Sequence, residues 1–403
     1  MNLTHTYNIH TGDNVNDQTI AIHGHEYFDD KYGSFIVPIY QTAIFEQIVR
    51  ETGERRVTDR DTDLKYSREE NPTVRHLEKT LAKLEGGEDS LCFSSGMAAI
   101  STLFIGFLKR GDEIVLSKEA YGTTIQLAQE LSKFGVKAKL AYPRAEDLIE
   151  ATSFKTKIMF VETMTNPTLK VVDVKELVKH CKDEGITLVV DNTFVTPVIY
   201  KPLSDDADVV IHSLTKYLAG HNDVISGAVI SSSEVVNELW DWRRKLGCIA
   251  APLEAYLVLR GLKTLVLRVK RHSESAMTVA EFLNEHPKVE EVLYPGLPNS
   301  EWHKVAKSLF KNGLYGGVVS FKVKGGIDET LKVFKGVKLI RPSPSLGGPE
   351  SLMTIPVLSI AAKMPKETRD ELGITENLIR LSVGLEDVDD IIEDLDKSLQ
   401  SVQ

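Results

Sequence analysis

Short apolar runs, each long enough for one buried strand, alternate with helix-like segments in the first half of the sequence. The runs cover 113–116, 158–161, 186–190 and 207–211. A strand that is apolar on both faces is typical of a mainly parallel sheet with helices packed on each side. The pattern therefore predicts an α/β fold, in which ligands bind at the carboxyl ends of the strands.

The segments between these runs carry helix signals at both ends. Asn71-Pro72 supplies a capping residue and a proline suited to the first helical turn, and Gly86 ends the apolar periodicity that follows. Asp173 and Gly185 bound another such segment in the same way. Further helices are expected over 97–109 and 124–134.

The sequence changes character near residue 250, and its 403 residues are enough for two domains, each with its own core. A long helical stretch over 252–285 leads to a second α/β unit with strand-like runs at 318–323 and 378–383 and a final helix at 387–399. The polar segment 1–65 is either a flexible loop or an arm ordered against another subunit. We therefore expect three parts, over 1–65, 66–250 and 251–403.

Two polar residues stand where two of the strands end. Asp191 closes the run 186–190, and Lys216 follows the run 207–211. An acid and an amine at neighbouring strand ends suggest a site for pyridoxal phosphate (PLP), whose aldehyde forms a Schiff base with lysine and whose ring nitrogen pairs with a carboxylate. Taken alone, Lys216 is equally compatible with a surface lysine, and Asp191 with a turn or capping aspartate.

Three further positions would complete such a site. The segment Ser94-Ser95-Gly96-Met97 joins a strand to a helix, where backbone N–H groups bind anions such as phosphate. Tyr121 follows the run 113–116 and is placed to stack on a flat ring. Arg380 alternates with apolar neighbours on a strand and needs either a substrate carboxylate or a structural acid as its partner. Ordinary serine capping and a packed tyrosine are the alternatives for the other two.

Composition excludes several other classes of protein. The formal net charge of −10 offers no basic field to nucleic-acid phosphates. No apolar stretch reaches the roughly 18 residues that a membrane helix needs, and the polar N-terminus does not read as a signal peptide. Cys92, Cys181 and Cys248 lie far apart, without the spacing of a disulfide framework or a zinc site. We expect a cytoplasmic protein without a metal, nucleic-acid or membrane partner.

A set of specific motifs runs through the chain from about Tyr27 to the C-terminus. They are Tyr66-Ser67-Arg68, Asn71-Pro72-Thr73, Phe93-Ser94-Ser95-Gly96-Met97, Asn166-Pro167-Thr168, Asp191-Asn192-Thr193-Phe194, His212-Ser213-Leu214-Thr215-Lys216-Tyr217-Leu218, Ser345-Leu346-Gly347-Gly348 and Ile379-Arg380-Leu381-Ser382-Val383-Gly384. In these motifs the chain closely resembles the cystathionine γ-synthase/γ-lyase family, the PLP enzymes of Cys/Met metabolism. The resemblance implies an aspartate-aminotransferase-like fold with PLP as cofactor.

The resemblance also implies a role for individual residues. Lys216 would be the Schiff-base lysine and proton shuttle, and Tyr121 would stack on the ring and assist proton transfer. Tyr66 and Arg68 would reach the phosphate of a neighbouring subunit, so that the arm 1–65 joins subunits into a homotetramer, a dimer of dimers with shared active sites. The other cofactor-binding residues would be Gly96, Met97, Asp191, Thr193, Ser213 and Thr215, and the substrate-binding residues Asn166, Ser345 and Arg380.

The implied reaction is C–S cleavage of a cystathionine-like substrate by γ-elimination, as in transsulfuration. Its alternatives within the family are γ-replacement on an O-acylhomoserine and methionine γ-lyase-like activity. An aminotransferase is disfavoured by Tyr66 and Arg68, and a non-catalytic binding protein by the presence of Lys216.

The chain departs from the common family pattern where the distal end of the substrate is expected. Thr123 stands where a second glycine is usual after the tyrosine, and Gln126 where an arginine is frequent. Pro344 replaces a glutamate before Ser-Leu-Gly-Gly, and Thr354-Ile355-Pro356-Val357 replaces a His-Pro-rich stretch. The motifs therefore do not choose among the sulfur amino acids.

Overall fold

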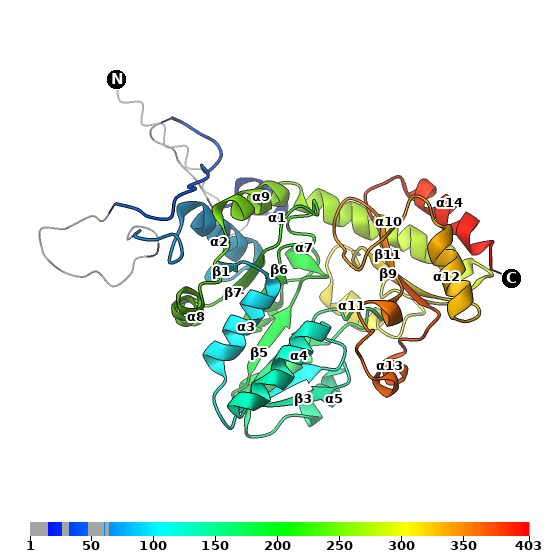
Figure 1. Ribbon diagram of the computed structural model, residues 1–403, viewed down its shortest axis with the longest axis horizontal. Helices are drawn as coiled ribbons and strands as arrows, with labels where there is room; N and C mark the ends of the chain where they lie inside the picture. The colour runs from blue at the N-terminus through cyan, green and yellow to red at the C-terminus, as the bar shows by residue number, and fades with distance from the viewer. Residues whose placement is uncertain (1–14, 26–31, 47–59, 61–63, 403) are drawn as a thin grey trace, which may run out of the picture.

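The structure, a computed structural model, describes residues 15–25, 32–46, 60 and 64–402. Its strands form two sheets, one from residues 89–231 and the other from residues 289–382 (Figure 1). Helices alternate with strands through both parts of the chain. The predicted α/β class is therefore confirmed.

The larger sheet has the strand order β1-β7-β6-β5-β4-β2-β3. Its strands are β1 Asp89–Phe93, β2 Glu113–Ser117, β3 Lys137–Ala141, β4 Thr156–Glu162, β5 Thr187–Asp191, β6 Val209–Ser213 and β7 Gly227–Ser231. Strands β2 to β6 run parallel, whereas β7 runs antiparallel to both β1 and β6. The four predicted runs correspond to β2, β4, β5 and β6. Because these strands are parallel, the carboxyl ends of β4, β5 and β6 lie at one edge of the sheet.

Successive residues of the central strands face opposite cores. On β5, Leu188 and Val190 belong to one apolar cluster and Val189 to the other. The first cluster is covered by α2 Pro72–Glu85, α5 Ala145–Glu150, α6 Val174–Glu184 and α9 Pro252–Leu262, and the second by α3 Gly96–Phe107, α4 Gly122–Glu130 and α8 Ser233–Leu246. Helices thus cover both faces, as the apolar runs predict.

The predicted helix boundaries are confirmed at their caps. The Asn71 side chain accepts a hydrogen bond from the Thr73 N–H at 3.0 Å, and Gly86 ends α2 in the left-handed region, with φ 85°. The long helix expected over 252–285 is instead two helices, α9 and α10 Leu265–Glu285. Thr264 leaves helical geometry between them, with φ −113° and ψ 7°.

The smaller sheet has the order β10-β11-β12-β9-β8 and carries Arg380. Its strands are β8 Val289–Leu293, β9 Val318–Val323, β10 Arg341–Pro342, β11 Leu352–Thr354 and β12 Leu378–Ser382. The remaining helices are α1 Asp17–His23, α7 Thr196–Ile199, α11 His303–Leu309, α12 Ile327–Gly336, α13 Lys366–Leu372 and α14 Val388–Leu399. Helices α10, α12 and α14 lie beside this sheet (Figure 1). The strand-like runs and the final helix expected in this half are confirmed.

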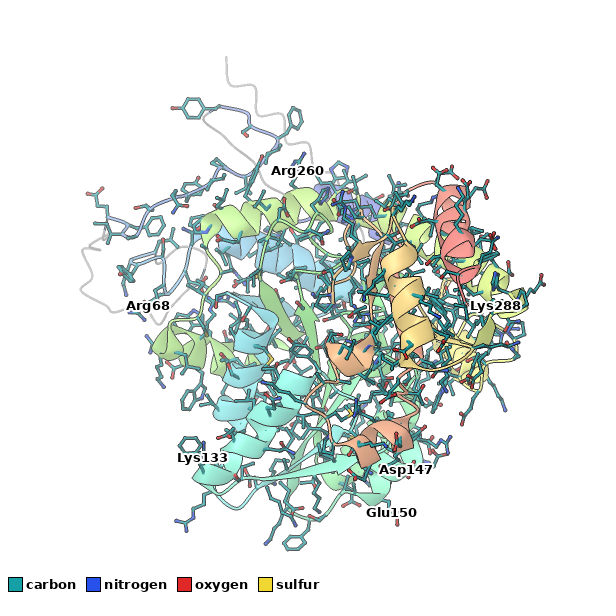
Figure 2. All side chains as sticks on the ribbon, turned by 45° about the vertical axis from the view of Figure 1, so that its right-hand side comes forward. Arg68, Lys133, Asp147, Glu150, Arg260 and Lys288 are labelled. Atoms are coloured by element: carbon teal, nitrogen blue, oxygen red, sulfur yellow. The ribbon has the colours of Figure 1, made fainter. Side chains whose placement is uncertain are left out.

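Charged side chains such as Lys133 and Glu150 project outward from the ends of helical segments (Figure 2). Within the described residues, no helix is both long and apolar enough to cross a membrane. The same residues contain no group of three or more His, Cys, Asp or Glu side chains arranged to hold a metal ion.

Candidate active site

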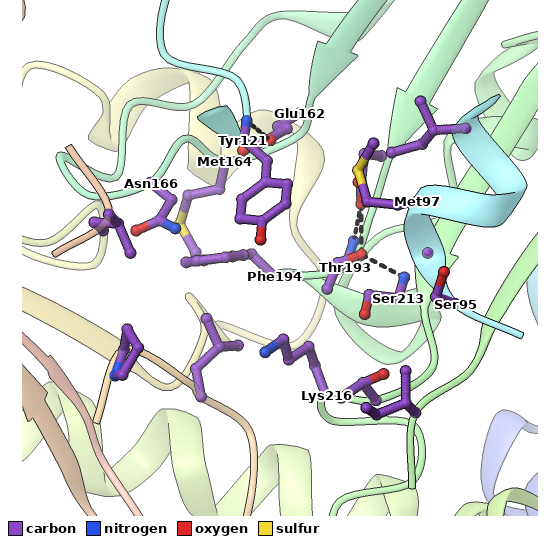
Figure 3. Close-up of a pocket in the computed structure, with 18 residues that line it drawn as sticks. Ser95, Met97, Tyr121, Glu162, Met164, Asn166, Thr193, Phe194, Ser213 and Lys216 are labelled. Atoms are coloured by element: carbon purple, nitrogen blue, oxygen red, sulfur yellow. Dashed lines mark hydrogen bonds between the residues drawn. The ribbon is translucent and has the colours of Figure 1, made fainter. Parts of the chain in front are cut away.

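A pocket opens at the carboxyl ends of β4, β5 and β6, the edge at which an α/β sheet binds ligands. It is lined by residues from both halves of the chain (Figure 3). Nine of the predicted site residues line it, namely Gly96, Met97, Tyr121, Asn166, Asp191, Thr193, Ser213, Thr215 and Lys216. Sequence positions more than a hundred residues apart are therefore brought together here.

Lys216 lies in the turn that follows β6. The turn is held by a hydrogen bond from the Lys216 N–H to the Ser213 carbonyl, at 3.3 Å. The Lys216 Nζ donates to the Ser345 hydroxyl at 3.0 Å. Burial, together with the positive charge of Arg380, lowers the pKa of the Lys216 amine from its ordinary value. A neutral, partly buried amine is the form that attacks an aldehyde.

Asp191 is the last residue of β5, and Thr193 holds its carboxylate in place. Its Oδ1 accepts hydrogen bonds from the Thr193 N–H at 3.0 Å and the Thr193 hydroxyl at 2.5 Å. The Thr193 hydroxyl in turn accepts the Ser213 N–H at 2.8 Å, which ties β5 to β6. Burial raises the pKa of the Asp191 carboxyl, so a cationic partner in the pocket would stabilise its charged form.

The start of α3 forms a cradle beside these strand ends. The Ser95 hydroxyl caps the helix by accepting the Ala98 N–H at 3.0 Å. Gly227 on β7 packs so closely on the Ser95 carbonyl that a Cβ there would overlap it. A Cβ on Gly96 would lie 3.2 Å from the Cβ of Ser213. These close approaches bring the helix N-terminus to the pocket, where its N–H groups favour an anion such as phosphate.

Tyr121 reaches into the pocket from the side opposite Lys216 (Figure 3). Its backbone N–H donates to the Oε1 of Glu162 at 2.6 Å. Glu162 ends β4 and lies directly across from Asp191 on β5. Glu162 was not among the predicted site residues, although it occupies the same strand-end position as Asp191, and that position was the available signal.

Arg380 is fully buried on β12. Its guanidinium donates to the Asn166 side-chain oxygen at 2.9 Å and to the carbonyls of Pro344 and Ser345 at 2.7 and 2.9 Å. Within the described residues it forms no ion pair, and its Nε has no hydrogen-bond partner. Burial lowers the pKa of Arg380 to about 10. The structure therefore disfavours a structural salt bridge and favours the predicted alternative, a carboxylate from outside the chain.

Two of the predicted substrate residues adjoin the pocket without lining it. Ser345 touches Lys216, and Arg380 touches Asn166, which both line the pocket. An apolar wall of the pocket was not predicted either, because its side chains come from several separate segments of the sequence. Its residues are Ile100, Met164, Phe194, Ile225, Leu346 and Ile360, and the predicted departure Pro344 continues it.

Tyr66 and Arg68 do not line the pocket of their own chain. Arg68 lies at the edge of the molecule beside α8, where it donates to the Arg244 carbonyl (Figure 2). Its guanidinium also lies over the Tyr66 ring, 5.4 Å from the ring centre. Thr123 and Gln126 are exposed on α4 and lie outside the pocket lining as well.

Comparison with known proteins identifies the family. Residues 18–400 match the model of the Cys/Met metabolism PLP-dependent enzymes. The chain belongs to this family. It is 40% identical to the L-methionine gamma-lyase of Fusobacterium nucleatum over 95% of this chain and 98% of that one. It is 39% identical to the cystathionine gamma-lyase of Bacillus subtilis, over 96% and 99% of the two chains. The crystal structure of metB from Corynebacterium glutamicum matches with a TM-score of 0.90 and 38% identity, over 96% and 99%.

Family membership confirms the predicted resemblance, the fold and PLP as the cofactor. The chain is a PLP-dependent enzyme of Cys/Met metabolism. The residues present fit that cofactor on three independent grounds. The cradle at Ser95 suits a phosphate, the partly buried Asp191 carboxylate suits a ring cation, and the Lys216 amine, whose pKa is lowered, suits an aldehyde.

Proposed function

We propose that the enzyme is a carbon–sulfur lyase that cleaves cystathionine by γ-elimination. The observation that carries this is the buried Arg380, whose partners are all neutral and which adjoins Lys216. Such a cation suits the α-carboxylate of an amino acid, which it would hold with the α-carbon near the lysine amine. The relatives named cystathionine gamma-lyase and L-methionine gamma-lyase support elimination at the γ-carbon.

The proposal assigns the cofactor to the residues at the strand ends. Asp191, whose Oδ1 is already bound by Thr193, would hold the ring nitrogen. Lys216 would bind the aldehyde, and Tyr121 would cover the ring. The phosphate is held by the N–H groups of the α3 start and by hydroxyls, with contributions from Gly96, Met97, Ser213 and Thr215.

During the reaction the chain's own groups bind the substrate and move protons. Arg380 and Asn166 bind the α-carboxylate, with Ser345 beside them. The freed Lys216 Nζ removes the α-proton, and the Tyr121 hydroxyl assists transfer. Bound PLP supplies the electron sink at the α-carbon. A second proton is then removed at Cβ, and the electron pair left there breaks the Cγ–S bond. The sulfur takes up a proton and leaves as cysteine, and water converts the four-carbon remainder to 2-oxobutanoate and ammonia.

Methionine is a second candidate substrate, favoured by the apolar wall of the pocket. Cystathionine carries an amine and a carboxylate at its distal end, whereas methionine ends in a methyl group. Among the described lining residues the carboxyl and amine side chains are those of Glu162, Asp191 and Lys216, and Pro344 and Ile360 belong to the apolar wall. Such a wall suits a methyl group better than two charges.

A product assay separates these functions. Purified enzyme is incubated with cystathionine, with methionine, and with an O-acylhomoserine plus cysteine, and Lys216→Ala serves as the inactive control. Cysteine with 2-oxobutanoate from cystathionine supports the proposal, and methanethiol from methionine supports the second candidate. Homocysteine with pyruvate would instead reveal β-cleavage, and cystathionine formed from the acylhomoserine would reveal γ-replacement.

We also propose that the enzyme is a homotetramer, a dimer of dimers whose active sites are shared. The described part of the N-terminal arm exposes large apolar side chains, such as Phe35 at 99% and Ile44 at 69% exposure. Exposed apolar groups of this size mark a surface that another chain covers. Tyr66 and Arg68 follow this arm and lie away from their own pocket, as residues that serve a neighbour's phosphate would.

A further inference from the structure

Glu162 is a buried acid in the pocket that the reaction above does not use. It is only 6% exposed and faces Asp191, its register partner on the neighbouring strand. Two carboxylates at neighbouring positions in a buried site do not both ionise without a cation between them, because the second charge is repelled by the first. The ionisation state of Glu162 therefore decides how much negative charge lies at this end of the pocket.

The groups around Glu162 favour its neutral form. Asp191 faces it from β5, and Glu119, in the loop after β2, adds a second negative charge nearby. Within the described residues no Lys, Arg or His forms an ion pair with Glu162; the lysine beside Glu119, Lys170, pairs with Glu119 itself. Burial and the charge of Asp191 raise the pKa of the Glu162 carboxyl well above its ordinary value.

Glu162 also fixes the backbone of Tyr121. Its Oε1 accepts the Tyr121 N–H at 2.6 Å, just before the first turn of α4. A neutral carboxylic acid keeps a carbonyl oxygen for this hydrogen bond. One side chain therefore lies beside Asp191 and, through the backbone, holds the aromatic ring that covers the cofactor.

We infer that Glu162 works as a protonated positioning residue: it holds Tyr121 over the cofactor ring and leaves Asp191 as the sole anion facing the ring nitrogen. This role concerns cofactor binding, so it holds for any of the substrates considered above. A negative lyase assay would therefore not contradict the role of Glu162, and a negative result for Glu162 would not contradict the proposed substrate.

Paired variants test the role in the holoenzyme. Glu162→Gln keeps the neutral shape and an acceptor for Tyr121, whereas Glu162→Leu keeps the size but removes the acceptor. We expect Gln to retain the dissociation constant for PLP within about twofold, and Leu to raise it about tenfold, because a backbone N–H then loses its partner. Folding of both variants is checked by circular dichroism. A Gln variant as impaired as Leu would overturn the proposal.

The pH titration of the bound cofactor's absorbance band distinguishes a neutral from an ionised Glu162. An anion near the cofactor favours its protonated form, so removing one lowers the midpoint of the titration. We expect Glu162→Gln to leave the midpoint within about 0.3 pH unit, whereas Asp191→Asn, which removes a true anion, lowers it by about one unit or more. A comparable drop in Glu162→Gln would show an ionised glutamate and refute the inference.

Infrared spectroscopy reads the protonation state of the carboxyl directly. Wild-type holoenzyme with ¹³C-labelled glutamate carboxyls should show the C=O stretch of a protonated glutamate at neutral pH. The part of that band due to Glu162 should be missing from the spectrum of the Glu162→Gln variant. If the two spectra agree in this region, Glu162 is ionised in the working enzyme and the inference is wrong.

Discussion

At the scale of single residues, the most consequential feature is a buried guanidinium whose charge acts on the Lys216 amine. Arg380 is fully buried and has only neutral partners, and its charge contributes to the lowered pKa of Lys216. A lysine must lose its proton before it attacks an aldehyde, and the neutral fraction increases as pH rises through the pKa. A lowered pKa therefore moves the onset of reactivity to lower pH.

This gives a prediction for cofactor uptake by the apoenzyme. In Arg380→Gln the cation is lost, the pKa of Lys216 rises, and the pH profile of the rate of PLP incorporation shifts to higher pH. Arg380→Lys retains the charge and should keep a profile close to wild type. The rate is followed by growth of the absorbance band of bound PLP. Equal profiles for Gln and wild type would mean that Arg380 has no electrostatic effect on Lys216.

The second prediction concerns binding of the substrate carboxylate by Arg380. Arg380→Ala should weaken binding of glycine to the holoenzyme by about 2–5 kcal/mol, the usual loss when one partner of a buried charged pair is removed. Methylamine, which is glycine without its carboxylate, should bind wild type and variant alike. Both affinities come from titration of the cofactor absorbance. A parallel loss for methylamine would point to general damage to the pocket instead of a lost carboxylate contact.

At the scale of elements, a buried ion pair ties three segments around the pocket together. Lys170 donates to Glu119 at 2.9 Å and to the Leu372 carbonyl, at the end of α13, at 2.8 Å. Glu119 also accepts the Thr168 N–H at 2.8 Å. Glu119 lies two residues before Tyr121, and Thr168 lies two residues after Asn166. The cluster therefore links the segment before Tyr121, the segment after Asn166 and the second half of the chain.

Breaking the buried Lys170–Glu119 pair should lower the free energy of unfolding much more than breaking the partly exposed Lys118–Glu371 pair nearby. Lys170→Met leaves Glu119 buried without its cation, for an expected loss of about 3–5 kcal/mol in the free energy of unfolding. Lys118→Met is the matched control. Lys118 pairs with Glu371 and so also joins the segment after β2 to α13, but it is partly exposed. Its expected loss is about 0–1 kcal/mol. Denaturant titrations at equal protein concentration compare them; similar losses would contradict a stabilising role specific to the buried pair.

The close contact between β7 and the start of α3 is equally open to test. In Gly227→Ala the new Cβ overlaps the Ser95 carbonyl, so the start of α3 has to move. We expect the PLP dissociation constant to rise at least about tenfold, in line with the cost of overpacking. Gly326→Ala, at an exposed position before α12, should leave that constant unchanged. The apoenzyme is titrated with PLP in both cases. Unaltered affinity in Gly227→Ala would show that the phosphate does not depend on this contact.

A structural feature can be predicted from the sequence when it depends on neighbouring residues, and much less well when it depends on how distant strands pair. Apolar runs and caps are local, so the strands around Asp191 and Lys216 and the helix that starts at Asn71 were predictable. The antiparallel course of β7 was not, because the direction of a strand is set by its partners. Glu162 did carry a local signal, its position at the end of a strand, but its pairing with Asp191 across the sheet, 29 positions away in the chain, was not predictable.

At the scale of the whole molecule, the pocket lies where the two halves of the chain meet. Lys216 and Tyr121 come from the part with the larger sheet, whereas Pro344, Leu346 and Ile360 come from the part with the smaller one. The resemblance assigns Tyr66 and Arg68 to the cofactor phosphate, but neither lines the pocket of its own chain: Arg68 is at the edge of the molecule, and its guanidinium lies over the Tyr66 ring. This placement agrees with the proposal that Tyr66 and Arg68 serve the site of another chain.

Shared sites predict that two inactive variants restore activity when mixed. A Lys216→Ala subunit can lend Tyr66 and Arg68 to a partner, and an Arg68→Ala subunit still has an intact Lys216. After unfolding and joint refolding in equal amounts, half of the dimers are hybrid and each hybrid has one complete site, so we expect about one quarter of wild-type activity.

The control is a mixture of Lys216→Ala with Asp191→Ala. Both residues line the pocket of one and the same chain, so each subunit of a hybrid lacks one of them and this pair should restore nothing, whichever chain supplies Arg68. Recovery is measured as product formation per subunit, against each variant refolded alone. If the Lys216→Ala and Arg68→Ala mixture stays at the level of the separate variants, the site is complete within one chain, because each hybrid would then contain no intact pocket.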